Sequence, residues 1–334
     1  MQAHAQGTLT DAAMNEQFDA AVRDTLRRFE EAGETIVTDG EQRKSSFATY
    51  PLTGLTNLAG GGVTIPFVDG HTRQLPVITA GPFKYGAYAA SYLTAAKPHT
   101  KRTLKQAVIS ASALSLLYPQ GGIAGYDQAA FITDLVEEAA KDLRLALDAG
   151  AHVVQIDFTE ARLSLKLDPS GGLLQQFVDL NNQVLERFTA AERKKFGVHT
   201  CPGGDHDSTH SADIPYAQLL PTLFKLNVGN FYVQLASEQD RPSVLRMLGE
   251  LASGERRIFV GVTDPCSSKV ETEEDVEQRV LEAAKYIKAE WLGTTDDCGF
   301  SPFGDDTSTS RDTAFAKIAA RVAGTARASR SLGL

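Results

Sequence analysis

The 334-residue chain contains few cysteines, and its 33 lysines and arginines are fewer than its 42 aspartates and glutamates. Three cysteines cannot all pair within one chain, which disfavours a disulfide framework and favours thiol or metal roles in a reducing compartment. The formal net charge is -9 and no basic run appears, so nucleic acid and membrane surfaces are poor partners. We expect a cytoplasmic protein that acts on small molecules.

Long apolar runs are also missing. No stretch approaches the ~20 residues of a membrane span, and Met1 to Asp11 lacks the charged-then-apolar pattern of a signal peptide. The composition, 42% hydrophobic, is enough to bury one large core. No repeat or linker divides the chain, so we expect one domain over residues 1–334, with residues 1–14 irregular.

Short runs rich in valine and isoleucine alternate with helical stretches, which is typical of strand–helix units around a parallel sheet. The predicted strands are Glu34–Thr38, Lys105–Ile109, His152–Asp157, Gly197–Thr200, Asn230–Gln234, Arg257–Val262 and Leu292–Thr295. An α/β barrel fits this repeat.

The predicted helices fill the spaces between these strands. They include Gln17–Glu31, a stretch from Phe131 to Leu147 with an apolar residue every four positions, a helix opening at Thr272, and Thr313–Ala328. Residues 60 to 80 break the alternation, because two strand-like runs flank Asp69-Gly70. This segment predicts an inserted β-hairpin.

Side chains that can bind metal or substrate follow the predicted strands. They are Glu41, Asp157, His199 with Cys201, Asp264 and Cys298. The carboxyl ends of the strands of a parallel barrel meet at one mouth, where such folds carry their chemistry. The clustering therefore predicts one shared site.

His199 and Cys201 are alternate residues of an extended segment, so both side chains can point the same way. With Cys298 from another strand end, they would occupy three corners of a tetrahedral metal site and leave the fourth open for substrate. A buried cysteine taken singly is more often a packing residue. A soft-metal site is thus favoured over structural cysteines, and both interpretations stay open.

Five ordered motifs resemble the C-terminal catalytic domain of cobalamin-independent methionine synthase, over about residues 20–330. They are Asp39-Gly40-Glu41, Val154-Gln155-Ile156-Asp157, His199-Thr200-Cys201, Gly261-Val262-Thr263-Asp264 and Asp297-Cys298-Gly299. The resemblance implies a single (β/α)8 TIM-barrel domain with zinc (Zn2+) held by His199, Cys201 and Cys298. It also implies that Glu41 and Asp157 hold the amino group of a thiol amino acid.

The activity that the resemblance implies is zinc-dependent methyl or alkyl transfer to a small, homocysteine-like thiol that the metal activates as a thiolate. The implied partners are this thiol and an electrophilic alkyl donor, with a possible homo-oligomer. One alternative is an epoxide-opening thiol transferase resembling epoxyalkane:coenzyme M transferase. Another is a barrel related to uroporphyrinogen decarboxylase, with no metal or only a structural one.

One departure from the family pattern concerns the fourth zinc ligand. The synthases carry a zinc-binding glutamate after the fifth strand, where this chain has Gln234, which we expect to contact substrate. Asp205, His206, Asp207 and His210 lie close enough in sequence to supply a ligand instead. They could equally form a polar loop that caps the next helix.

Further departures concern catalysis and binding. Cys266 stands where the synthases have a histidine, as a further ligand, a proton donor or a packing residue, and we expect Asp157, Asp264 and Cys266 to take part in catalysis. Arg43, beside Glu41, could bind a substrate carboxylate or phosphate, or join a surface ion-pair cluster. Phe158 suggests an apolar pocket or ordinary core packing.

The first strand of the family's barrel has no evident counterpart in Met1–Met14. We expect this strand to be irregular or missing. If it is missing, the open edge of the barrel would need a cover, for example a partner subunit.

Overall fold

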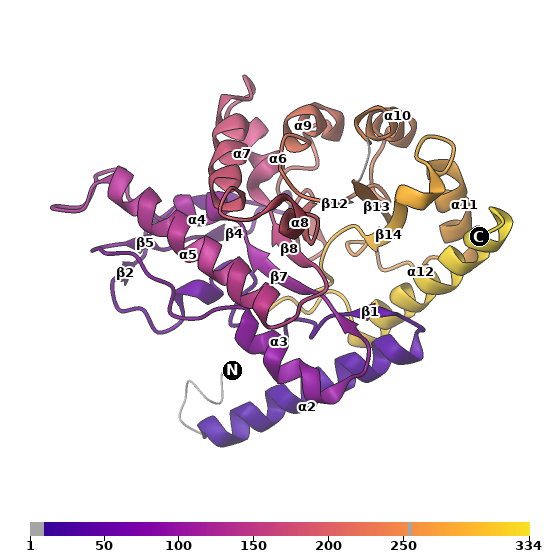
Figure 1. The fold of residues 1–334 in the computed structure, drawn as a ribbon, viewed down its shortest axis with the longest axis horizontal. Helices are drawn as coiled ribbons and strands as arrows, with labels where there is room; N and C mark the ends of the chain where they lie inside the picture. The colour runs from indigo at the N-terminus through magenta and orange to yellow at the C-terminus, as the bar shows by residue number, and fades with distance from the viewer. Residues whose placement is uncertain (1–9, 253–255) are drawn as a thin grey trace.

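Parallel strands form the centre of the molecule and helices surround them (Figure 1). The computed structural model describes residues 10–252 and 256–334. Six strands form one sheet in the order β14-β13-β12-β9-β8-β7. They are β7 (Gln106–Ile109), β8 (Val154–Asp157), β9 (Phe196–Thr200), β12 (Asn230–Val233), β13 (Arg257–Thr263) and β14 (Leu292–Asp296).

A seventh strand position completes the described part of the barrel. Strand β1 (Ile36–Val37) pairs in parallel with β6 (Thr103–Leu104), and only Lys105 separates β6 from β7. All seven predicted strands are therefore confirmed, and the fold is TIM-barrel-like. Within residues 10–252 and 256–334 no ladder joins β14 to β1 and no eighth strand precedes α2 (Asp11–Glu31); residues 1–9 lie outside the described part.

An ion pair lies across the space between β14 and β1. Arg321, on α12 (Arg311–Ser331), donates to Asp296 at 3.0 Å and also binds Glu34, just before β1. Helix α12 and α2 lie at the same end of the molecule (Figure 1) and touch through Phe29 and Phe315, whose ring centres are 5.4 Å apart. Side chains thus close the seam that strand pairing leaves open.

Helix α2 begins earlier than the sequence predicts. The Thr10 hydroxyl accepts the Ala13 N–H at 3.2 Å, which satisfies one of the free donors of the first turn. Met14 is buried. Residues 11–14, expected to be irregular, are therefore helical.

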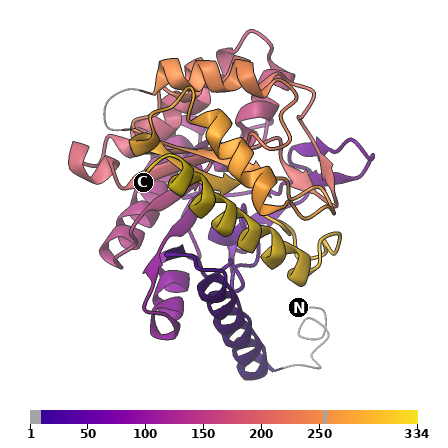
Figure 2. The same cartoon turned by 90° about the vertical axis from the view of Figure 1, so that its right-hand side faces the viewer.

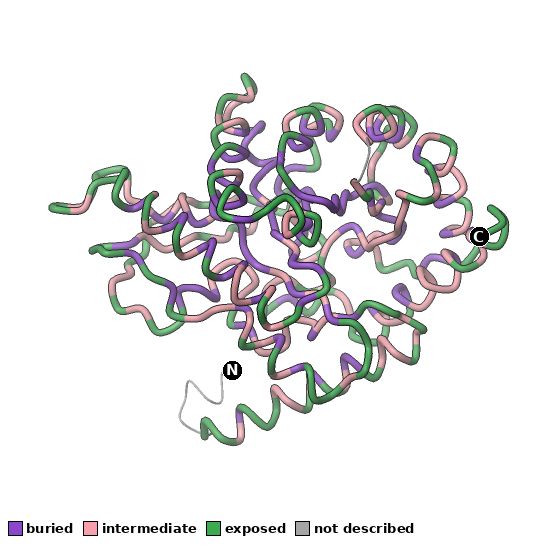
Figure 3. Tube along the Cα trace, in the orientation of Figure 1, coloured by how far each residue is buried: buried purple, intermediate pink, exposed green. Residues whose placement is uncertain are grey.

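The other helices form the outer layer, with buried residues on their inward faces (Figure 3). They are α3 (Ala90–Ala96), α4 (Ala111–Ser115), α5 (Gln128–Asp148), α6 (Glu160–Leu167), α7 (Gly172–Leu185), α8 (Ala190–Arg193), α9 (Tyr216–Leu223), α10 (Arg241–Leu251) and α11 (Glu273–Ala283). Helix α11 starts where predicted, because Thr272 and Asp275 each accept the other's backbone N–H. None of the helices in the described ranges is long and apolar enough to span a membrane.

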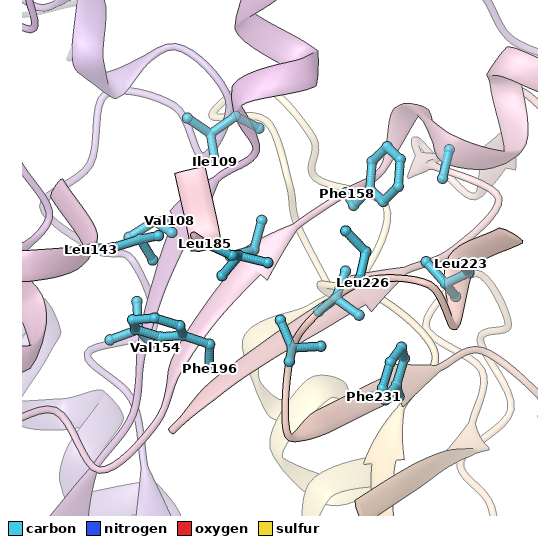
Figure 4. Packing of buried hydrophobic residues seen from close by; sticks show 14 of the residues in the cluster. Val108, Ile109, Leu143, Val154, Phe158, Leu185, Phe196, Leu223, Leu226 and Phe231 are labelled. Atoms are coloured by element: carbon cyan, nitrogen blue, oxygen red, sulfur yellow. The ribbon is translucent and has the colours of Figure 1, made fainter. Parts of the chain in front are cut away.

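The core between sheet and helices is largely aliphatic and aromatic (Figure 4). The Phe224 and Phe231 rings stack with centres 4.2 Å apart. Phe158 is fully buried in this cluster, so its role is core packing and the apolar-pocket interpretation is wrong. Burial of one such side chain contributes roughly 1.5–3 kcal/mol.

The inserted hairpin is confirmed. Strands β3 (Thr64–Pro66) and β4 (Thr72–Gln74) pair in antiparallel fashion, and β2 (Leu58–Ala59) pairs with β5 (Val77–Ile78) below them. Gly70 takes φ +93° in the turn, a region that glycine enters without steric cost. The hairpin lies beside a short loop ladder, β10 (Gly204–Asp205) with β11 (Ser208–Thr209) (Figure 2), and Val68 donates to the Thr209 carbonyl at 3.0 Å.

Candidate functional site

His199, Cys201 and Cys298 converge at the carboxyl ends of β9 and β14. One ligand atom from each lies within 4.8 Å of the other two, and the two sulfur atoms are 3.2 Å apart. Cys201 is fully buried, while His199 and Cys298 keep partial exposure. The structure brings together the three residues that the sequence proposes as metal ligands, although they are up to 99 positions apart (298 minus 199).

The backbone after β9 supports the sulfur atoms. The Gly203 N–H points to Cys201 Sγ at 3.4 Å. Gly203 has φ +72°, and a Cβ there would lie 1.8 Å from the His210 ring, so only glycine fits. A hydrogen bond with Cys201 and one with His199 lower the pKa of Cys298, while the same contact with Cys298 raises that of Cys201. The contact between the two sulfur atoms and the contact with His199 thus favour the thiolate form at Cys298.

Asp157 ends β8 directly beside the metal ligands, in register with His199 on β9. Burial, followed by the charge of Glu41, raises the pKa of Asp157 to about 6. The charge of Glu41 therefore acts on Asp157. These are the two residues that were expected to hold the amino group of the substrate.

Gln234 directly follows β12, and its side-chain polar atoms bind protein groups. Its carbonyl oxygen accepts from Arg162 Nη1 at 2.8 Å, and its amide donates to Ser237 Oγ at 3.0 Å. The Arg162 guanidinium is almost fully buried and also donates to the Ile214 carbonyl at 2.7 Å. Contact of Gln234 with substrate stays a prediction. Sequence patterns gave no sign of the partnership with Arg162.

Asp264 and Cys266 lie beside the loop that follows Cys201. The Asp264 carboxylate accepts the Cys266 N–H at 3.0 Å, and the Asp264 N–H donates to Glu271 at 2.9 Å. Cys266 Sγ packs on Gly204, where an added Cβ would lie 2.9 Å away, and burial raises the pKa of this thiol. Cys266 is not one of the converging metal ligands in the described residues, and its catalytic role stays a prediction.

Arg43 contacts α2. It forms an ion pair with Asp19, donates to Asn15 Oδ1 at 3.0 Å, and lies over the Phe18 ring. These contacts match the alternative that placed Arg43 in an ion-pair cluster. A role in substrate binding stays a prediction with no geometric support.

Asp205 joins the hairpin to the loop that follows Cys201. Its buried carboxylate accepts from Arg73 Nε at 2.6 Å and lies 2.9 Å from His71 Nε2. Arg73 also pairs with Asp305 at 2.8 Å, in the loop after Cys298. The carboxylate of Asp205 is thus compensated by cations, although Asp205, His206 and Asp306 lie close enough together to resemble a second metal site. This contact was not predicted from the sequence, although the alternation of Asp69, His71 and Arg73 on the hairpin could have indicated it.

His210 is the remaining candidate for a fourth ligand. It is buried, and its Nδ1 has no hydrogen-bond partner among the described residues. Burial lowers the pKa of its imidazole to about 4, so the ring is neutral at physiological pH. Among the described residues it is not within the converging group of His199, Cys201 and Cys298, and its role as a fourth ligand stays a prediction.

Comparisons with known proteins agree with this geometry. Residues 1–320 match the family described as cobalamin-independent synthase, catalytic domain. A methionine synthase of Sulfurisphaera tokodaii is 23% identical over 296 residues, covering 89% of this chain and 79% of the relative. One of Pyrococcus furiosus is 22% identical over 293 residues, covering 85% and 77%.

Solved structures share the fold. A B12-independent methionine synthase from Shewanella sp., in complex with selenomethionine, superposes with a TM-score of 0.78 at 17% identity, covering 97% of this chain and 91% of that one. A putative vitamin-B12-independent methionine synthase from Listeria monocytogenes gives 0.68 at 20% identity, with 96% and 91% covered. The chain therefore belongs to the cobalamin-independent synthase catalytic-domain family.

Proposed function

We propose that this protein is a zinc-dependent methyl- or alkyltransferase that acts on a small thiol such as homocysteine. The observation that carries the proposal is the convergence of His199, Cys201 and Cys298 within 4.8 Å, beside Asp157. The low cysteine count supports a reducing, cytoplasmic setting for such chemistry.

The donor set fits zinc. One imidazole and two thiols are ligands that Zn2+ prefers, and three protein ligands leave a position open for substrate, as in catalytic zinc sites. Bound zinc would lower the pKa of a thiol in that position, so that the reactive thiolate forms at neutral pH.

The residues around the donors would position the thiol. Glu41 and Asp157 would bind its ammonium group, which places the sulfur toward His199, since Asp157 and His199 are neighbours across β8 and β9. The sulfur attacks the alkyl carbon of the donor, a carbon–sulfur bond forms, and the leaving group departs with the electron pair of the broken bond. Holding the sulfur in one orientation would lower the entropic part of the activation free energy.

The methionine synthase names of the relatives favour methyl transfer. They do not favour the epoxide-opening and metal-free alternatives. The second substrate would be an electrophilic methyl or alkyl donor.

The test is turnover of homocysteine with a panel of methyl donors, read by mass spectrometry. We expect methionine to form with the zinc-loaded protein and to be lost in Cys298→Ser. Product from an epoxide and a thiol, with none from any methyl donor, would favour the first alternative. Protein that holds no zinc when purified would contradict the proposal.

A further inference from the structure

Lys44 is a buried cation that the proposed metal centre does not use. Its side chain is 1% exposed and its ammonium lies 2.5 Å from Glu41 Oε1. It donates to the Ala107 carbonyl at 2.9 Å and lies 4.5 Å from the centre of the Tyr50 ring. A buried ammonium costs free energy unless it is paired, so Lys44 is stable here only together with these partners.

Glu41 is held in a backbone conformation that residues with side chains rarely adopt. Its φ is +56°, and such a conformation persists only where the surroundings impose it. The Glu41 N–H donates to Asp39 Oδ1 at 3.0 Å, and Lys44 holds the carboxylate from the other end. The Glu41 side chain nevertheless stays 34% exposed. In the described residues Lys44 occupies Oε1, which leaves Oε2 for a ligand at the mouth.

Three carboxyl groups lie around the Lys44 ammonium. They belong to Asp39, Glu41 and Asp157, and each attracts its charge. A substrate ammonium is a cation like that of Lys44, so the same carboxyl groups would attract it to this part of the site.

We propose that Lys44 is a positioning residue that sets the specificity of the site for a thiol with an amino group. It would hold the Glu41 carboxylate in the orientation that faces the substrate. This inference rests on the proposed function, because it assumes that a thiol binds beside Glu41 and Asp157.

Binding of two thiols tests the inference without a methyl donor. The zinc-loaded protein would be titrated by calorimetry with homocysteine and with 4-mercaptobutyrate, which is homocysteine without its amino group. Lys44→Met removes the charge, Lys44→Arg keeps it, and Lys141→Met is the matched control. Lys141 also lies 4.5 Å over a tyrosine ring, that of Tyr88, but on the outer helix α5.

We expect Lys44→Met to weaken homocysteine binding by roughly ten- to a hundredfold, the range for one lost charged hydrogen bond. It should leave 4-mercaptobutyrate binding and zinc content unchanged. Lys44→Arg should keep the preference for homocysteine, and Lys141→Met should match the wild type. If Lys44→Met does not fold, Lys44→Gln, which retains a donor for the Ala107 carbonyl, replaces it with the same expectation.

Equal effects of Lys44→Met on both thiols, or none on homocysteine, would overturn the inference and leave the proposed function standing. Wild-type protein that binds zinc but neither thiol would instead overturn the proposed function, and this inference with it. The two failures are therefore distinguishable in one set of titrations.

Discussion

Each cysteine sulfur in the chain has a different environment, and this difference leads to a prediction for zinc. Cys201 and Cys298 touch at 3.2 Å beside His199, whereas Cys266 packs on Gly204. We expect Cys201→Ser and Cys298→Ser to lose zinc, because a serine hydroxyl is a poor zinc ligand compared with a thiolate. Cys266→Ser should keep about one zinc per chain. Metal analysis of the three purified variants distinguishes these outcomes, and full retention of zinc in all of them would contradict the assignment.

Gln234 leads to a second prediction, because its side-chain amide lies between a cation and an anion. Arg162 binds its carbonyl at 2.8 Å, and Glu238 lies 3.3 Å from its amide nitrogen. In Gln234→Glu the new carboxylate should stay with Arg162 and repel Glu238. We expect unchanged zinc affinity in chelator competition and a loss of about 1 kcal/mol in unfolding free energy. A tenfold gain in zinc affinity would mean that the carboxylate reaches the metal.

Residue types and strand ends were enough to predict that the three candidate metal ligands lie together. His199, Cys201 and Cys298 could be proposed because each follows a strand that periodicity reveals, and parallel strands end at one mouth. The partners of Gln234 and Lys44 could not be predicted. They depend on how α6 and β7 pack against the mouth, which no local pattern records.

At the scale of elements, the inserted hairpin binds the loop that follows Cys201, through His71 and Arg73 on the hairpin and Asp205 in the loop. Burial alone would lower the pKa of His71, but its bonds with Asp205 and Asp69 outweigh burial and raise it above the usual value. The pKa of His71 in the folded protein thus exceeds the unfolded value of 6.5. The stabilisation that His71 contributes is therefore fully present below pH 6.5 and is lost as the pH rises through the folded pKa.

Hydrogen exchange of the hairpin amides, corrected for the intrinsic pH effect, measures this contact. We expect the hairpin to exchange faster, relative to α5, at pH 8 than at pH 6, and His71→Gln to abolish the difference. His152→Gln, at an exposed position, is the control. A pH dependence that survives His71→Gln would show that another group controls the hairpin.

Elements that carry a sequence pattern of their own were predictable. The helices α2, α5, α11 and α12 follow apolar periodicity over many residues, the strands of the barrel are short runs rich in valine and isoleucine, and the hairpin flanks Asp69-Gly70. The ladder of β10 and β11 has two residues in each strand, too few for any period. It depends on tertiary contacts with the hairpin and on left-handed backbone at His206 and Asp207.

At the scale of the whole molecule, Arg321 replaces strand pairing between β14 and β1. Its guanidinium binds Asp296 and Glu34, and all three side chains are less than one-fifth exposed. Arg321→Met would leave two largely buried carboxylates without the guanidinium that binds them both, at a cost of about 3 kcal/mol. Arg327→Met is the matched control, because Arg327 is about one-third exposed and binds Glu274 and Glu277 on the outer surface, where such pairs contribute less than about 1 kcal/mol each.

Urea unfolding measures both variants. The account predicts a clearly lower midpoint for Arg321→Met and a nearly unchanged one for Arg327→Met. Equal midpoints would mean that the barrel does not depend on this seam. Arg321 could not have been identified from the sequence, because its role depends on the edges of β14 and β1, which come to face each other only in the folded barrel.

The central claim is that His199, Cys201 and Cys298 hold a zinc ion with one position open to a thiol. Zinc K-edge X-ray absorption of the purified protein, recorded without and with homocysteine, tests it most directly. The account predicts two sulfur ligands, from Cys201 and Cys298, in the free protein and three when homocysteine is present. A sulfur count that stays at two after homocysteine is added would contradict it.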